Sequence, residues 1–196
     1  MSPPLSDAGL DLLWRRARTH RAWMDRPVDD ALLRRVYDLA KLGPTSANMC
    51  PLRIVFVKSP EAKDLLRPCL NEGSRDLSAP VTAVLGMEVH FYEDLPKLLP
   101  HTDARSWFAD LPAERLEYIA LRNASLQAAY FMLAARSLGL DCGPRSRFDP
   151  RRVNETFFAG TTVKSNFLCN LGYGDPRALR YWRDPRLDFD EVCSIR

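Results

Sequence analysis

The segment 43–51 constrains the fold of this chain most strongly, because a helical pattern ends there and a strand-like run begins. A glycine–proline pair stops the helix, and the β-rich stretch 52–57 follows a second proline. Three polar residues gather on this helix-to-strand corner: Thr45, Ser46 and Asn48. The corner is either an ordinary turn, in which such residues are common, or a hydrogen-bonding surface suited to a planar ligand such as a flavin or a base.

The rest of the chain alternates between helical and strand-like patterns. Apolar spacing predicts helices over about 7–18, from 29 to 40, after 60, over 112–138 and over 150–158, and a short helix in the tail 181–196. Strands are expected over 52–58, 81–87 and 165–172, with short helical pieces and loops at 91–111 and a loop at 142–149. The stretch 124–135 is apolar almost all round, which predicts burial in the core or at a subunit interface. These patterns predict one α+β or α/β domain over residues 1–196.

Composition and charge exclude several classes of protein. The formal net charge of +3 is too small to argue for nucleic-acid binding. The five cysteines are scattered without a C-x-x-C pair, and the three histidines have no metal-ligand spacing, so neither a disulfide framework nor a metal site is expected. No signal-peptide pattern and no apolar run of membrane-spanning length is found, so we expect a cytoplasmic protein without a membrane partner.

Three further polar clusters are candidates for ligand binding. Arg18, Thr19 and Arg21 offer two guanidinium groups and a hydroxyl that suit a phosphate, or they form a solvated helix end. Arg183 and Arg186 form a second basic group, or an ordinary run of surface charge. The loop 140–149 has backbone N–H groups for a flavin edge, or it is a plain connection.

Motifs of other enzyme classes are absent. The chain has no dinucleotide-binding G-x-G-x-x-G, no P-loop, no H-E-x-x-H and no G-x-S-x-G. If the protein is an enzyme, a cofactor is therefore expected to carry the chemistry while the chain supplies orientation and electrostatics.

Five stretches spread over nearly the full length form a specific combination: Ala17–His20, Gly43–Asn48, His101–Phe108, Arg122–Tyr130 and Leu171–Asp175. Together they resemble the FMN-dependent nitroreductases, and within them the malonic semialdehyde reductases of the pyrimidine-utilisation pathway. The resemblance implies an α+β nitroreductase-like fold, with a central mixed sheet flanked by helices and a long buried helix at a dimer interface.

The resemblance also implies an intertwined homodimer with two FMN sites at the interface. Five side chains of one subunit would hold the phosphate and ribityl end: Arg18, Thr19, Arg21, Arg183 and Arg186. Three corner residues would approach the same flavin from the partner: Thr45, Ser46 and Asn48. Three residues would face the isoalloxazine ring with their backbone: Pro144, Arg145 and Ser146, whose N–H would lie near N5. Asn71 and Arg75 would contact the pyrimidine side.

The chain departs from the subgroup at the predicted ring face. Arg145 and Arg147 stand where an apolar residue and a glycine are usual, so two cations could narrow the site, bind an acidic substrate or a nicotinamide cofactor, or weaken FMN binding. Cys50 and Leu52 replace a glutamine and a tryptophan of the wider family, which fits a specialised subgroup.

The resemblance implies that the protein uses FMN and NADH or NADPH to reduce malonic semialdehyde to 3-hydroxypropionate, with nitro compounds and quinones as further oxidants. The alternative is a flavin-binding protein of the same fold whose turnover is lost or altered by the two arginines. Nucleic-acid binding is the weakest hypothesis, because the arginines are spread among acidic residues and no recognition motif occurs.

Overall fold

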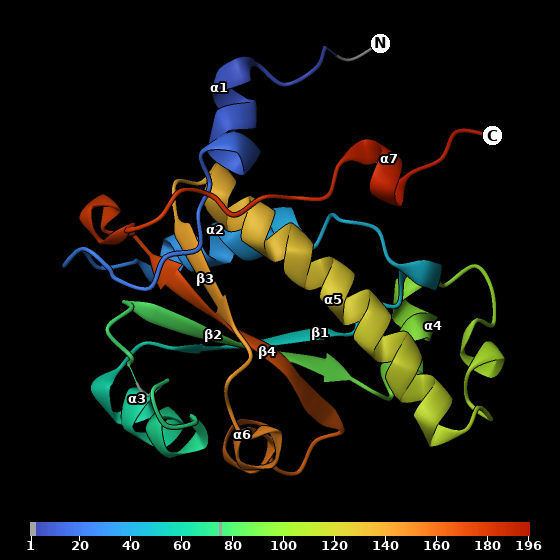
Figure 1. Cartoon of the computed structure of the whole chain (residues 1–196). Coiled ribbons are helices and arrows are strands. Elements are labelled where there is room, and N and C mark those ends of the chain that lie inside the picture. Colours follow the sequence, from blue (N-terminus) through green and yellow to red (C-terminus); the bar gives the residue numbers. More distant parts are fainter. Residues whose placement is uncertain (1–2, 75) are drawn as a thin grey trace.

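The computed structural model describes residues 3–74 and 76–196 (Figure 1). Arg75, predicted to contact the flavin, lies outside the described residues. The centre is a four-stranded sheet in the order β1-β2-β4-β3. Its strands are β1 (Leu52–Val57), β2 (Val81–Glu88), β3 (Asp141–Arg145) and β4 (Val163–Gly172).

Every pair of neighbouring strands in this sheet is antiparallel. The prediction of a mixed sheet is therefore wrong, because the sheet is antiparallel throughout. Parallel pairing occurs at an isolated bridge that joins Thr19, outside the named strands, to Cys142 of β3. The sheet's central strand β2 is buried along seven of its eight residues, as its apolar sequence predicts.

Strand β3 is the main element that the sequence prediction missed, since 142–149 was expected to be a loop. Its five residues include Gly143 and Pro144, which are both unfavourable in a central strand. The strand lies at the edge of the sheet, where proline is tolerated because its missing N–H is not needed for a second ladder. Long-range pairing with β4 therefore overrides the local preference for a turn.

The helices cover both faces of the sheet (Figure 1). On one face α2 and α5 form a core with β2 and β4, and on the other α3 and α6 pack with the opposite sides of the strands. The helices are α1 (Asp7–Leu10), α2 (Asp30–Ala40), α3 (Pro60–Leu66), α4 (Leu95–Leu98), α5 (Ala113–Ser137), α6 (Pro150–Phe157) and α7 (Phe189–Val192). Helix α1 continues as a π-helical turn, Asp11–Arg15. The predicted helix positions are confirmed. Asp29 occupies the N-cap position of α2 without a side-chain capping bond, and the Ser59 side chain caps α3 by accepting the Ala62 N–H.

Helix α5 is buried along one face and exposed along the other within a single chain. Its buried face includes Asn123, Gln127 and Phe131. The opposite face exposes Tyr118, Leu121 and Leu126. The chain's own core thus buries only one face of the helix that was predicted to be buried in the core or at a subunit interface.

The segment 89–112 leaves the sheet and forms short helical pieces, as expected. Phe91, Tyr92 and Leu95 pack with the first turns of α5 into a separate apolar cluster. The corner before β1 contributes Met49 to the same cluster, so this segment and the corner are packed together. Across the part of the chain that the structure describes, no helix has the length and apolar character needed to cross a membrane.

Candidate functional site

The basic segment 18–21 lies alongside the edge strand β3. Thr19 forms a parallel bridge with Cys142, and the His20 N–H donates to the Cys142 carbonyl at 3.1 Å. Gly143 makes this approach possible, because a Cβ at that position would lie only 2.4 Å from the His20 carbonyl oxygen. The structure therefore brings Thr19 next to the strand that carries Pro144 and Arg145.

His20 anchors the segment from beneath. Its imidazole is buried, with Nε2 at 3.6 Å from a carboxylate oxygen of Asp141. Asp141 also accepts the Gly174 N–H at 2.9 Å, and a Cβ on Gly174 would lie 2.0 Å from His20 Nδ1. His20 is thus a buried packing residue whose imidazole lies near Asp141 and against Gly174.

The C-terminal tail is attached to the same region, and Figure 1 shows it passing beside the end of α1. Arg18 donates to the Tyr181 carbonyl at 2.8 Å. In return, Arg183 donates to the carbonyls of Trp14, Arg15 and Ala17 at the end of the first helix. The structure therefore joins Arg18 and Arg183 in one place although 165 positions separate them in the sequence (183 − 18).

The remaining predicted phosphate residues differ in their availability. Arg21 and Thr19 are exposed, and no hydrogen bond or ion pair occupies their side chains among the described residues. Arg186 donates to the nearby carbonyls of Asp184 and Pro185 at 2.9 and 3.0 Å, so its contacts in this chain are local. Because a guanidinium has five N–H donors, Arg18 keeps others free for an anion.

At the end of β3, Pro144 and Ser146 are exposed while Arg145 is half-buried and turned to a neighbouring loop. Its guanidinium donates to the Asp76 carbonyl at 2.9 Å and to the Ser74 carbonyl. Burial lowers the pKa of Arg145, an effect that nearby Asp76 partly offsets. Arg145 therefore fastens the loop to the strand. The exposed Arg147 side chain has no such partner among the described residues.

The corner lies away from this cluster within one chain. It precedes β1, while the cluster adjoins β3, and these strands form opposite edges of the sheet. At the start of β1, Leu52 pairs with Met87 of β2, and Met87 in turn pairs with Lys164 of β4. The part of β4 that pairs with β3 lies at its other end, over residues 168–172. Thr45, Ser46 and Asn48 are thus not brought together with Arg18 by a single subunit.

Hydrogen bonds use most polar groups of the corner. The Thr45 hydroxyl accepts the Cys50 N–H at 3.3 Å, and the Asn48 amide donates to the Leu98 carbonyl at 2.8 Å. The exposed Ser46 hydroxyl has no partner among the described residues. The corner can therefore offer the Ser46 and Thr45 hydroxyl protons to a ligand, while the Asn48 amide is already engaged.

Known proteins share this architecture and much of this sequence. Residues 14–173 match the Nitroreductase family. The chain belongs to this family. A relative from Burkholderia lata, named "Putative NADH dehydrogenase/NAD(P)H nitroreductase", is 59% identical over 193 residues, which cover 97% of this chain and 98% of the relative. A relative of the same name from Stenotrophomonas maltophilia is 57% identical over the full length of both chains.

Solved structures of the family have the same fold. A "putative nitroreductase in complex with FMN" from Exiguobacterium sibiricum matches with a TM-score of 0.85 at 17% identity, covering 100% of both chains. A nitroreductase family protein from Streptococcus pneumoniae matches with a TM-score of 0.82 at 22% identity, covering 94% of this chain and 98% of the other.

The chain also contains supporting residues to which the sequence prediction assigned no role. The buried amides of Asn123 and Gln127 in α5 accept the backbone N–H groups of Ser46 and Leu52, both at 2.9 Å. Two polar residues on the buried face of a largely apolar helix were a sequence signal for a specific polar contact. Their partners, 77 and 75 positions away, could not be read from the sequence.

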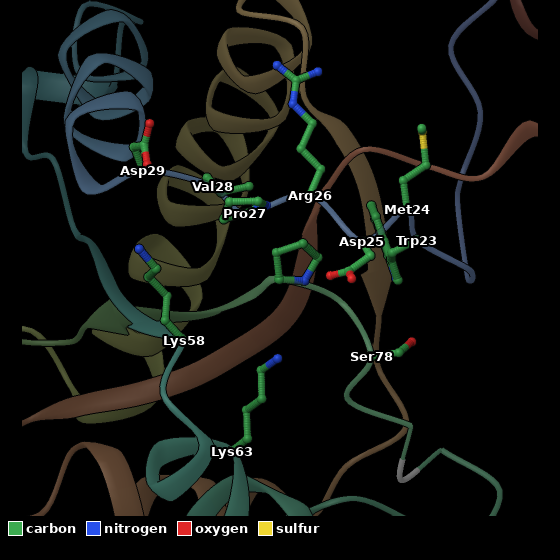
Figure 2. A pocket seen from close by; sticks show the side chains of 11 residues that line it. Trp23, Met24, Asp25, Arg26, Pro27, Val28, Asp29, Lys58, Lys63 and Ser78 are labelled. Atoms are coloured by element: carbon green, nitrogen blue, oxygen red, sulfur yellow. The ribbon is translucent and has the colours of Figure 1, made fainter.

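The chain also has an open cavity of about 520 Å³ beside the 23–29 segment (Figure 2). Figure 2 shows Lys58 and Lys63 on one side and Asp25 on the other. Lys58 pairs with Asp30 at 2.5 Å, and Lys63 donates to the Ala79 carbonyl at 2.7 Å. Burial lowers the pKa of Lys63. The mixed charges of this cavity give it no preference for a phosphate, and none of the predicted flavin residues lines it.

Across residues 3–74 and 76–196, no group of three or more His, Cys, Asp or Glu side chains could hold a metal ion.

Proposed function

We propose that this chain is an FMN-dependent NAD(P)H oxidoreductase. The observation that supports this most directly is the convergence of the 18–21 segment, the β3 edge and the Arg183 tail at one place. The names of the close relatives and the FMN in a structural neighbour agree with it.

The residues fit an FMN by chemistry and placement. Thr19 and Arg21 supply an exposed hydroxyl and an exposed guanidinium for the phosphate, and Arg18 and Arg183 add further N–H donors. The exposed β3 edge beside them would carry the isoalloxazine ring, with Pro144 and Ser146 facing it. A planar ring suits the far end of this edge strand. The Thr19–Cys142 bridge occupies the first part of β3, and among the described residues no other strand covers its Pro144–Arg145 end.

We infer that the site is completed by a second copy of the chain. The corner precedes β1, at the edge of the sheet opposite to β3. Thr45, Ser46 and Asn48 would therefore contact the flavin that is bound at β3 of the partner subunit. The exposed apolar face of α5 and the tail offer a surface for this homodimer, because large apolar patches are uncommon on monomers. Its members include Tyr118, Leu121, Leu126, Tyr181 and Trp182.

When bound, FMN would supply the chemistry of hydride transfer between the nicotinamide and the oxidant. The chain's own residues would bind and orient the reactants, with the arginines neutralising the phosphate and the corner hydroxyls holding the polar ring edge. No side-chain nucleophile is required, which agrees with the absence of nucleophile motifs.

We further propose malonic semialdehyde as the oxidant, reduced to 3-hydroxypropionate, with nitro compounds and quinones as additional acceptors. This rests on the combined motifs of the sequence, such as His101–Phe108 and Arg122–Tyr130. The relatives' names, which include NAD(P)H nitroreductase, support nitro compounds as acceptors.

A visible absorption spectrum of the purified protein, followed by anaerobic addition of NADPH or NADH, tests the proposal. Bound flavin that bleaches with either nucleotide supports an oxidoreductase. Reoxidation by malonic semialdehyde, compared with a nitroaromatic acceptor, then tests the substrate. A protein that remains colourless after incubation with FMN contradicts the proposed function.

A flavin-binding protein without turnover is the second candidate, because Arg145 and Arg147 stand at the proposed ring face. The structure favours it less, since Arg145 is turned to the carbonyls of Ser74 and Asp76. Flavin that binds but is not bleached by either nucleotide would favour this candidate.

A further inference from the structure

The corner that would reach the partner's flavin has an unusual backbone. Ala47, Asn48 and Cys50 have positive φ angles of 49°, 50° and 42°. Asparagine tolerates this left-handed region, but alanine and cysteine are disfavoured there because of their Cβ atoms. A non-glycine residue in this region is strained and persists only where surrounding contacts impose the conformation.

Helix α5 supplies such contacts at both ends of the strained stretch. Asn123 accepts the N–H of Ser46, immediately before Ala47, and Gln127 accepts the N–H of Leu52, two residues after Cys50. The two amides are four positions apart and therefore project from the same face of the helix. Both side chains are almost fully buried, at 1% and 6% exposure, so water cannot replace either bond without rearrangement.

The orientation of these amides is itself determined by the helix. Asn123 donates its NH₂ group to the Ile119 carbonyl at 3.0 Å, which leaves its oxygen directed at the Ser46 N–H. A third contact lies further along α5, where the Tyr130 hydroxyl donates to the Pro44 carbonyl at 3.2 Å. The Tyr130 ring also covers Gly43, where a Cβ would lie 2.0 Å from Cδ2.

From this geometry we propose that Asn123 and Gln127 are positioning residues of the flavin site. They hold the corner in its left-handed conformation and thereby aim Thr45 and Ser46 at the flavin of the other subunit. The inference rests on the proposed function, and it assigns the two amides a role in cofactor affinity rather than in fold stability alone.

The test uses two variants that remove the acceptor while keeping the side-chain size, Asn123→Leu and Gln127→Met. Hydrogen–deuterium exchange of peptides covering 43–52 is measured on the FMN-free protein, and FMN affinity is measured by titration. We expect exchange to accelerate and the FMN Kd to rise, each by about tenfold, because a buried N–H loses its only acceptor. Thermal unfolding of each variant shows whether the titrated protein is folded.

Ser125→Ala is the matched control, because it removes a 3.0 Å contact of α5 with Asn166 that does not touch the corner. We expect wild-type exchange at 43–52 and wild-type FMN affinity in this control. If the two buried variants are less stable but bind FMN within about twofold of the wild type, the residues are structural only and the inference is overturned.

Should neither buried variant fold, Tyr130→Phe decides, since it removes only the hydroxyl that contacts Pro44. Weaker FMN binding by about threefold with faster exchange supports the inference, and wild-type values overturn it. A wild-type protein that binds no FMN would instead contradict the proposed function. The exchange measurement then decides alone whether α5 holds the corner.

Discussion

At the scale of single residues, Arg18 serves two partners with one guanidinium. It holds the tail through the Tyr181 carbonyl and, in the proposed site, also binds the FMN phosphate. We expect Arg18→Ala to weaken FMN binding by about 1–3 kcal/mol, because a charge-assisted contact is lost. Titration of the apoprotein with FMN measures this. Arg16→Ala is the control, since Arg16 pairs with Asp11 at 3.0 Å and its side chain is 84% exposed. Equal affinities in the wild type and Arg18→Ala would contradict the assignment.

Arg145 is expected to affect stability, because its guanidinium is bound to a neighbouring loop. Because its guanidinium binds the carbonyls of Ser74 and Asp76, we expect Arg145→Met to lower the free energy of unfolding by about 1–2 kcal/mol. Arg147→Met, which loses no such contact, should stay within about 0.5 kcal/mol of the wild type. Urea unfolding of both variants measures the difference. Tighter FMN binding by Arg145→Met would show instead that the arginine obstructs the site.

At the scale of elements, the association of the 18–21 segment with β3 depends on a missing side chain. Gly143→Ala would place a Cβ 2.4 Å from the backbone oxygen of His20, which cannot move without displacing the segment. We expect a loss of about 1–3 kcal/mol in unfolding free energy and weaker FMN binding. Gly9→Ala is the matched control, because its Cβ would have ordinary contacts of 3.6 Å or more within a helix. Similar effects of both substitutions in urea unfolding and FMN titration would argue against this packing.

Strands β3 and β4 share a buried thiol pair whose ionisation predicts a pH effect. A hydrogen bond with Cys142, followed by burial, raises the pKa of Cys169 well above its ordinary value. The stabilising effect is present below the pKa of the unfolded thiol, about 8.5, and is lost as pH rises further, because only the unfolded chain ionises readily. We expect Cys169→Ala to lose stability less steeply than the wild type between about pH 8.5 and 10.5. Urea unfolding in reducing buffer measures both slopes, and parallel slopes would contradict the prediction.

At the scale of the whole molecule, the exposed face of α5 and the distant corner both point to assembly. We expect light scattering to give twice the chain mass of 22.3 kDa for the wild type. Leu126→Arg should shift the protein to a monomer and weaken FMN binding at least tenfold, because a buried, unpaired charge is costly at an interface and the partner's corner is lost. Glu155→Arg, an exposed change on α6, is the control. A monomeric wild type that binds one FMN per chain would overturn the dimeric site.

The sequence by itself determined the helices and strands in which the spacing of apolar residues shows which side is buried. Helices α2 and α5 and strands β1, β2 and β4 follow apolar spacing, and the start of α3 follows the local hydrogen-bonding chemistry of Ser59. It also predicted the clusters around Arg18 and Thr45, because short runs of polar and basic residues are visible without a fold.

Only the tertiary structure decided how these parts meet. Strand β3 exists because β4 pairs with it, against the local preference of Gly143 and Pro144. The amides of Asn123 and Gln127 find acceptor roles at the corner, and Arg145 turns to a loop rather than to the proposed ring face. The physical reason is the same in each case. Local spacing records which side of an element is buried, but a partner far away in the sequence is selected by packing.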